Sequence, residues 1–240
     1  MAKIVILISF LALTGAAYSL AAPHQRLVVH AKLSDIVHNV LPTPRHPGQG
    51  TRSENATPAT TWAAGLVAAA KDQIGITTQY DGAYQGLDYP MGDIDRRRGV
   101  CTDVVIRALR DAHDLDLQVA VHEDMADHFD AYPALWGLTG PDRNIDHRRV
   151  PNLRRYFERI GAERPLATTP SATDFRPGDI VTWSFGPGQP HIGIVSTQVD
   201  RRSQTPLIIH NAGAGTRLDN ILFSYPITGH YRLEDALRPT

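Results

Sequence analysis

The residues with the clearest chemical potential are one cysteine and two histidines. Cys101 is the only cysteine in the chain, and it lies where a glycine-containing loop enters a segment with an apolar helical stripe. Its sulfur is therefore expected at a helix N-terminus, where the helix dipole and unpaired N–H groups favour a thiolate over a thiol. Such a thiolate is a candidate nucleophile, and a buried, inert cysteine is the alternative interpretation.

The two histidines are expected on neighbouring strands. His191 begins a segment of alternating residues at 191–197, and His210 lies in a second such segment at 207–211. In a hairpin with its tip at residues 200–201, positions whose numbers sum to 401 lie opposite each other, and the two histidines form such a pair. A histidine oriented by a second polar group is the base that a cysteine nucleophile requires. Two unrelated surface histidines are the alternative.

The elements that position these residues follow from the spacing of apolar side chains. Every fourth residue from Trp62 to Ile74 is apolar, which predicts a first helix, and further helices are expected at 101–112 and 151–160. Residues 122–146 are expected to be irregular. After the third helix the apolar period becomes two, which predicts strands at 179–185, 191–197, 207–211, 222–226 and 229–233. Helices followed by a run of strands indicate an α+β fold with an antiparallel sheet.

The start of the third predicted helix is unusually polar. Asp146, His147, Arg148, Arg149 and Asn152 precede or open it. With an aspartate or asparagine as the helix cap, this cluster predicts a buried polar anchor for the irregular segment before it.

The chain is expected to contain one domain behind two N-terminal segments. Residues 1–21 resemble a cleavable signal peptide, with Lys3, an apolar core at 4–13 and small residues after it. An uncleaved anchor is the alternative, but this core is shorter than the roughly 20 residues that span a bilayer. The Pro-rich segment 22–60 predicts a linker, and 61–240 the domain. We therefore expect an exported protein, periplasmic or secreted, without stable membrane insertion after cleavage.

The composition limits the partners. The 240 residues carry 24 Lys and Arg against 25 Asp and Glu, a net charge of -1 that gives no general reason to bind nucleic acid. One cysteine excludes an intrachain disulfide and a multi-cysteine metal site. His122 and His128 are six residues apart, which suits neither one helix face nor a usual zinc pair. We expect a monomer with no metal ion or other cofactor.

Several motifs resemble a known family. They are DRRRGVCTDVVIR at 95–107, PGDIVTW at 177–183 and PHIGIV at 190–195, with further matches at 142–153, 207–211 and 225–231. Over residues 65–233 the chain resembles the YijF-like family of exported bacterial proteins, a domain of unknown function. More distantly, the order of the cysteine helix and the histidine strands is similar to NlpC-type and CHAP-type cysteine hydrolases.

The distant resemblance implies a papain-like α+β fold and an amidase or endopeptidase acting on cell-wall peptidoglycan peptides or a related amide. By position, Cys101 matches the nucleophile, His191 the base and His210 the residue that orients the base. Asn211 is the alternative orienting residue, although strand alternation turns it to the other face.

The same resemblance suggests substrate-binding residues. NlpC-type enzymes use an aspartate before the cysteine, together with an upstream tyrosine, to recognise a peptide amino terminus. Here Val100 precedes the cysteine, so the aspartate is absent or is replaced by Asp103, while Tyr80 can fill the role of the tyrosine. Trp136 is expected to line a groove nearby, and Asn211 is a further candidate for substrate contact.

Other function classes remain open. A non-catalytic cell-wall-binding module could keep the same fold, a metal-dependent hydrolase could use the two histidines, and an acyltransferase could use the same cysteine–histidine pair. The occurrence of nucleophile, base and orienting residue in this order favours an enzyme over a binding module. It does not separate hydrolase from transferase.

Overall fold

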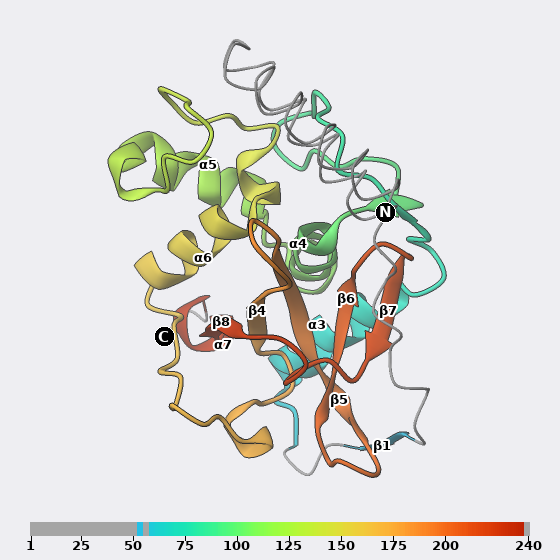
Figure 1. Cartoon of the computed structure of the whole chain (residues 1–240). Coiled ribbons are helices and arrows are strands. Elements are labelled where there is room, and N and C mark those ends of the chain that lie inside the picture. Colours follow the sequence, from blue (N-terminus) through green and yellow to red (C-terminus); the bar gives the residue numbers. More distant parts are fainter. Residues whose placement is uncertain (1–51, 55–57, 238–240) are drawn as a thin grey trace, which may run out of the picture.

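The computed structural model describes residues 52–54 and 58–237 (Figure 1). The predicted signal peptide at 1–21 lies outside the described residues, as does most of the predicted linker at 22–60. Within the described part, no helix combines the length and the apolar character needed to cross a membrane.

The four longer helices precede strands β4 to β8 in the chain. In Figure 1, α4, α5 and α6 lie above the strands, and α3 lies behind them. Their bounds are α3 (Thr61–Asp72), α4 (Cys101–His113), α5 (Leu117–Asp127) and α6 (Val150–Arg159), with the short helices η1 (Phe129–Ala131) and η2 (Asp146–Arg148) between α5 and α6.

The strands form one antiparallel sheet and one short parallel pair. The sheet order is β7-β6-β5-β4-β8, with β1 paired to β5, and β2 pairs with β3 in parallel. The predicted α+β class with an antiparallel sheet is confirmed, and β1 forms within the segment predicted to be a linker. The bounds are β1 (Arg52–Glu54), β2 (Gln79–Tyr80), β3 (Arg98–Gly99), β4 (Ile180–Ser184), β5 (Pro190–Asp200), β6 (Pro206–Asn211), β7 (Thr216–Asp219) and β8 (Ile227–Tyr231), and η3 (Ala172–Asp174) and α7 (Leu233–Leu237) complete the chain.

Helix α5 corrects the prediction that residues 122–146 are irregular throughout. Leu117, Val121 and Met125 are buried at a spacing of four, and the Asp116 side chain caps the first turn. The polar residues that follow Val121 obscured this stripe in the sequence, because they interrupt the apolar pattern halfway along the helix.

Several other predicted elements also differ in the structure, and β5 and β8 are among them, with bounds other than the predicted 191–197 and 229–233. Helix α3 ends at Asp72, so Ile74 is 42% exposed rather than inward-facing. The predicted strand at 222–226 is a turn, and β7 forms earlier in the chain instead. Leu222 is fully buried because it packs beneath Trp183, whose indole N–H donates to the Leu222 carbonyl at 3.0 Å. Burial within a turn therefore produced an apolar signal that resembled a strand.

Both faces of the sheet are covered by side chains. Ile192 and Ile194 pack against the helices, as their alternation predicted. The opposite face is also buried, where Trp183, Val195 and Ile208 form a second cluster. Helix α4 lies in the first cluster and is surrounded by protein, with every residue from Cys101 to Arg110 buried.

Buried cations fix the loop that leads into α4. The Arg107 guanidinium is 1% exposed and binds both carboxylate oxygens of Asp93. It also donates to the Thr77 hydroxyl at 3.2 Å. These contacts tie the long segment before Cys101 to the second turn of the helix, which positions the start of α4.

Candidate active site

Cys101 is the first residue of α4 and is only 5% exposed. Burial raises the pKa of its thiol to about 12, although backbone N–H groups of Ile192, Thr102 and Cys101 itself act in the opposite direction. This pKa corrects the expectation of a thiolate at the helix N-terminus. The effect of burial outweighs that of the helix dipole, and the protonated thiol is favoured at neutral pH. The contact with Ile192 also places the Cys101 sulfur beside β5, at the residue that follows His191.

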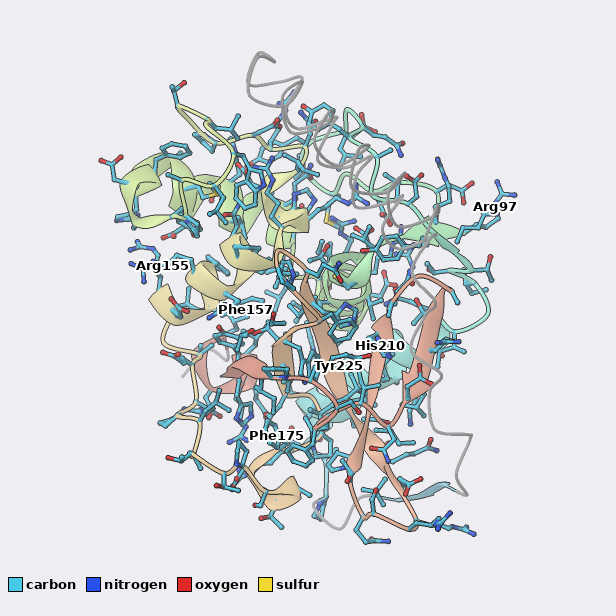
Figure 2. All side chains as sticks on the ribbon, viewed as in Figure 1. Arg97, Arg155, Phe157, Phe175, His210 and Tyr225 are labelled. Carbon is cyan, nitrogen blue, oxygen red and sulfur yellow. The ribbon has the colours of Figure 1, made fainter. Side chains whose placement is uncertain are left out.

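The two histidines meet as predicted. His191 Nε2 lies 2.9 Å from His210 Nδ1, with the ring planes nearly perpendicular at 88°. His210 Nε2 in turn lies 3.2 Å from an oxygen of Asp219. Both imidazoles are buried, and Figure 2 shows His210 near the centre of the molecule. The result is a continuous chain of polar contacts from β5 through β6 to β7.

The register between the two strands is not the predicted one. Ile194 pairs with Ile209 and Val195 with Ile208, so opposed residue numbers sum to 403 rather than 401. A register irregularity follows Val195, and the turn is wider than a hairpin tip at residues 200–201. The shift is an even number, so both histidines keep the same face and meet diagonally rather than directly.

Gly193 makes the diagonal contact possible. Continuing the observed register places it opposite His210. A Cβ atom at Gly193 would lie 3.1 Å from the Cβ of His210 and 2.6 Å from a methyl group of Ile208. The expectation that glycine leaves room beside the histidine is thus consistent with this packing, because any larger residue would displace the neighbouring strand.

An aromatic stack holds the plane of the His191 ring. Phe185 stacks on His191 with a centroid distance of 4.1 Å, and Tyr225 stacks on Phe185 at 4.0 Å. The ring of Trp183 lies 6.1 Å from His191. These rings restrict rotation of the imidazole, so its hydrogen bond to His210 keeps one direction.

Asp219 and Phe185 were missed in the sequence. Asp219 ends β7, a strand for which no period-two pattern was recognised, so nothing in the sequence linked it to His210. Phe185 was identified only as the end of a strand. The sequence alone cannot identify such a stacking partner, because stacking depends on where the fold places the opposing ring.

Asp103 supports α4 from within the protein. Both of its carboxylate oxygens bind Arg148 at 2.9 Å, and one also accepts the Val100 N–H at 2.7 Å. Burial opposes the charged form, but the Arg148 guanidinium lowers the pKa of Asp103 below its usual value. Asp103, which was considered for substrate contact, thus forms a buried ion pair beside Cys101.

Two of the other candidate substrate residues lie at the same helix start, whereas Trp136 lies at the polar anchor. Tyr80 is half-buried on β2 and pairs with Gly99, two residues before the cysteine. The buried side chain of Asn211 donates to the Gly99 carbonyl at 2.9 Å, so it ties the end of β6 to the entry of α4. Trp136 lies over the Arg149 guanidinium at 4.0 Å.

The predicted polar anchor is present at the start of α6, but the predicted aspartate or asparagine cap is wrong: Arg149 occupies the N-cap position, and its side chain makes no capping hydrogen bond. All five residues of the anchor are buried: Asp146, His147, Arg148, Arg149 and Asn152. Thr102, next to the cysteine, donates from its hydroxyl to the Arg148 carbonyl at 3.1 Å. The anchor therefore braces the first turn of α4. Across the part of the chain that the structure describes, no cluster of three or more His, Cys, Asp or Glu side chains is placed to hold a metal ion.

Comparison with known proteins identifies the family. A family model described as "Domain of unknown function (DUF1287)" matches residues 67–233, which include Cys101, His191 and His210. The chain belongs to the DUF1287 family. The "Uncharacterized protein YijF" of Escherichia coli (strain K12) is 53% identical to this DUF1287 chain over 163 residues, covering 68% of the chain and 78% of that protein.

Two solved structures also show distant similarity to the DUF1287 chain. They are NlpC1 and NlpC2 from Trichomonas vaginalis, each with 14% identity and a TM-score of 0.35 over 75% of the chain. The matches cover 46% of NlpC1 and 49% of NlpC2, so the chain spans about half the length of these proteins.

Proposed function

We propose that this protein is an exported cysteine hydrolase, an amidase or peptidase that cleaves cell-wall peptidoglycan peptides or a related amide. The observation that carries the proposal is the chain of contacts from His191 through His210 to Asp219, beside the strand position where the Cys101 sulfur accepts the Ile192 N–H. The signal-like start of the sequence supports export, and the papain-like order of elements supports the reaction class.

The hydrogen-bond chain supports one tautomer of the base. An ionised Asp219 can only accept, so the facing His210 Nε2 carries the proton and His210 Nδ1 is an acceptor. The bond between the histidines then requires a proton on His191 Nε2. His191 Nδ1 is left with a lone pair, which is what a general base for a thiol needs.

The reaction follows from these roles. As the Cys101 sulfur attacks the amide carbonyl, its proton passes to His191 Nδ1, and the imidazolium is stabilised through His210 and Asp219. The Cys101 backbone N–H, at the start of α4, donates to the developing oxyanion. His191 then gives the proton to the departing amine, leaving a thioester. Water attacks that thioester, His191 takes its proton, and the acid and the free thiol are released.

The high pKa of Cys101 favours this order of events. A thiol that is protonated at rest has to lose its proton during attack, rather than in a preformed thiolate–imidazolium pair. The proposed enzyme is thus a general-base hydrolase whose base acts in the same step as its nucleophile.

The deciding experiment compares wild-type protein with Cys101→Ala and Cys101→Ser on peptidoglycan and on a panel of acyl-peptides, with products identified by mass spectrometry. Hydrolysed amides are expected with the wild type alone. Pretreatment with iodoacetamide should abolish the activity, whereas EDTA should leave it unchanged. Products that survive Cys101→Ala, or activity lost to EDTA only, would overturn the proposal, as would the absence of any product.

A further inference from the structure

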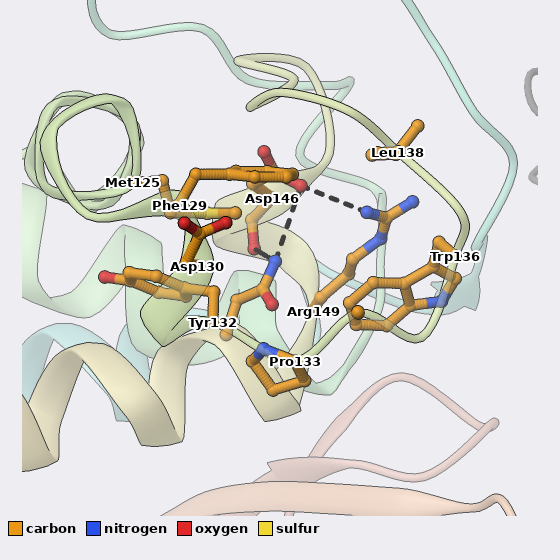
Figure 3. Close-up of a pocket in the computed structure, with 11 residues that line it drawn as sticks. Met125, Phe129, Asp130, Tyr132, Pro133, Trp136, Leu138, Asp146 and Arg149 are labelled. Atoms are coloured by element: carbon orange, nitrogen blue, oxygen red, sulfur yellow. Dashed lines mark hydrogen bonds and ion pairs between the residues drawn. The ribbon is translucent and has the colours of Figure 1, made fainter.

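A cavity of about 130 Å³ lies beside the polar anchor at the start of α6 (Figure 3). Its walls are largely apolar and include Met125, Phe129, Tyr132, Pro133 and Leu138. For comparison, a protein cavity of roughly 150 Å³ admits a benzene molecule. The space is therefore suited to a small organic group rather than to a single water molecule.

Two buried side chains that line this cavity have unsatisfied polar atoms. Arg149 Nη1 binds Asp146 at 3.0 Å, but the buried Nη2 has no hydrogen-bond partner among the described residues. Asn152 donates from its amide nitrogen to the Asp146 carbonyl at 3.2 Å, while its buried Oδ1 likewise lacks a partner. The arginine side chain is 8% exposed, and the asparagine is fully buried.

Such atoms are costly to leave unsatisfied. A buried donor or acceptor without a partner destabilises a protein by about 1–3 kcal/mol. Here one donor and one acceptor occur on residues of the same cavity, and Trp136 lies over the guanidinium and shields it (Figure 3). A ligand that offers one acceptor and one donor would provide hydrogen-bond partners for both Arg149 Nη2 and Asn152 Oδ1.

We propose that this cavity is a substrate subsite for a neutral amide group attached to a small aliphatic side chain. The amide carbonyl accepts from Arg149, and the amide N–H donates to Asn152, while the alkyl group contacts the apolar walls. A carboxylate fits less well, because Asp146 already neutralises the arginine and an anion offers Asn152 no donor.

The position of the cavity relates it to the reaction. Arg148, which directly precedes Arg149, binds Asp103 in the first turn of α4 and accepts the Thr102 hydroxyl on its carbonyl. The cavity residue Arg149 is thus adjacent in the chain to the residue that braces the start of α4, and in the proposed enzyme the cavity takes a part of the substrate beyond the cleaved amide. This assignment as a subsite rests on the proposed hydrolase function, whereas amide binding itself does not.

The test uses the full chain with Cys101→Ala, labelled with ¹⁵N, so that binding is measured without turnover. The chain has three tryptophans, and only Trp136 lines the cavity, so the indole N–H signals of Trp62 and Trp183 are internal controls. The probes are isobutyramide, isobutyrate and methyl isobutyrate, which share an alkyl group but differ in donor and charge. Trp136→Phe assigns the reporting signal.

Isobutyramide should shift the Trp136 signal alone, with saturation at about 1–10 mM, as a ligand of this size allows. The acid and the ester should bind at least about tenfold more weakly, a difference of about 1.4 kcal/mol. Arg149→Lys should weaken amide binding by a similar factor. Arg155→Lys is the matched control, since Arg155 lies on α6, the helix that begins directly after Arg149, and donates to the Ala131 carbonyl at 2.7 Å outside the cavity lining.

Three outcomes would overturn the subsite. Tighter binding of isobutyrate would identify an anion site instead. Equal shifts of all three tryptophan signals would show non-specific association, and no shift would show a purely structural cavity. If Arg149→Lys unfolds the chain, comparison of the three probes on the unaltered cavity still decides the result. Because no hydrolysis is measured, failure of the proposed enzyme activity would leave a positive binding result intact.

Discussion

His191 Nε2 and His210 Nδ1 lie 2.9 Å apart although the two residues do not face each other directly across the strands. The contact is diagonal, made possible by Gly193 opposite His210 and by the stack of Phe185 on the His191 ring. A diagonal pair depends on both strands holding their register, so the orientation of His191 depends on the pairing of β5 with β6. Asp219, on the third strand along, then determines which nitrogen carries each proton.

The hydrogen bonds from Asp219 through His210 to His191 predict that Asp219→Asn is more damaging than Asp219→Ala. In Asp219→Asn the new amide can donate to His210 Nε2, which moves protons to His210 Nδ1 and His191 Nδ1 and removes the base. We expect the rate of Cys101 alkylation by chloroacetamide at pH 7 to fall by about 10²–10⁴-fold. Asp219→Ala removes the acceptor without adding a donor, so neither tautomer of His210 is imposed, and the alkylation rate should fall less than in Asp219→Asn. The alkylation rate is measured by intact mass, since the chain has one cysteine.

Asp174→Asn, at an exposed site in η3, provides the control and should alkylate at the wild-type rate. If Asp219→Ala reacts as slowly as Asp219→Asn or more slowly, the tautomer argument is wrong.

Burial of the thiol predicts a distinctive pH profile for Cys101. Burial raises the pKa of the thiol to about 12, so its thiolate fraction at neutral pH is small and grows about tenfold per pH unit. In His191→Ala, where no base assists, alkylation should continue to accelerate beyond pH 9. A plateau near pH 7 in that variant would instead reveal a thiolate stabilised by the helix start. Denatured protein provides the reference rate for an exposed cysteine.

Gly193→Ala tests the steric basis of the diagonal contact. The added methyl group would meet His210 at 3.1 Å, Ile208 at 2.6 Å and the Ile209 carbonyl at 3.0 Å. We expect a loss of about 1–3 kcal/mol in the free energy of unfolding by urea, because the methyl overpacks the sheet. His210 should also be displaced, so alkylation of Cys101 at pH 7 should slow.

Gly86→Ala is the matched control, since a Cβ there meets no atom within 4 Å. Equal stability of the two glycine variants would show that β5 and β6 separate at no cost, contrary to the proposed role of the glycine.

The buried ion pair below the nucleophile predicts a large effect of Arg148→Met. The change leaves Asp103 charged and buried without its partner, which costs about 3–5 kcal/mol. Urea unfolding should show this loss, and Asp103→Leu combined with Arg148→Met should recover much of it. The double variant tests the pair itself, because a purely steric role of Arg148 would leave both variants equally destabilised.

The sequence was informative where local pattern and contact coincide. Cys101 at a helix start and the alternation around His191 were visible because each depends on neighbours within a few residues. The register shift was not visible, because it arises from a wider turn and an irregularity after Val195 that alternation alone does not specify. Asp219 and Phe185 were invisible for the same reason: their roles come from the packing of strands that are distant in the chain.

The helix dipole gave the wrong protonation state for Cys101 because exposure has no direct sequence signal. Apolar stripes indicated which face of α4 is buried, but the whole start of the helix is covered, including Asp103 and Arg107. The polar anchor at the start of α6 covers this helix start, because the Arg148 guanidinium binds Asp103 and the Arg148 carbonyl accepts from Thr102.

Adjacent residues of that anchor predict opposite pH dependences. Burial raises the pKa of Asp146 to about 6 and lowers the pKa of His147 to about 4. Between about pH 4 and 6 the folded state holds an extra proton on Asp146, so this residue makes the fold less stable as pH rises. Between about pH 4 and 6.5 the unfolded state holds the extra proton on His147, so this residue makes the fold more stable as pH rises.

The two contributions are each on the order of 3 kcal/mol and offset each other in the wild type. In Asp146→Asn only the histidine remains, so stability measured by urea unfolding should fall steeply from pH 6.5 to pH 4. In His147→Gln only the aspartate remains, so stability should rise over the same range relative to the wild type. Parallel pH profiles in all three proteins would show that neither group titrates differently in the folded state. Divergence in opposite directions would show that the anchor holds one carboxyl and one imidazole neutral near pH 5, directly beside the helix that carries the nucleophile.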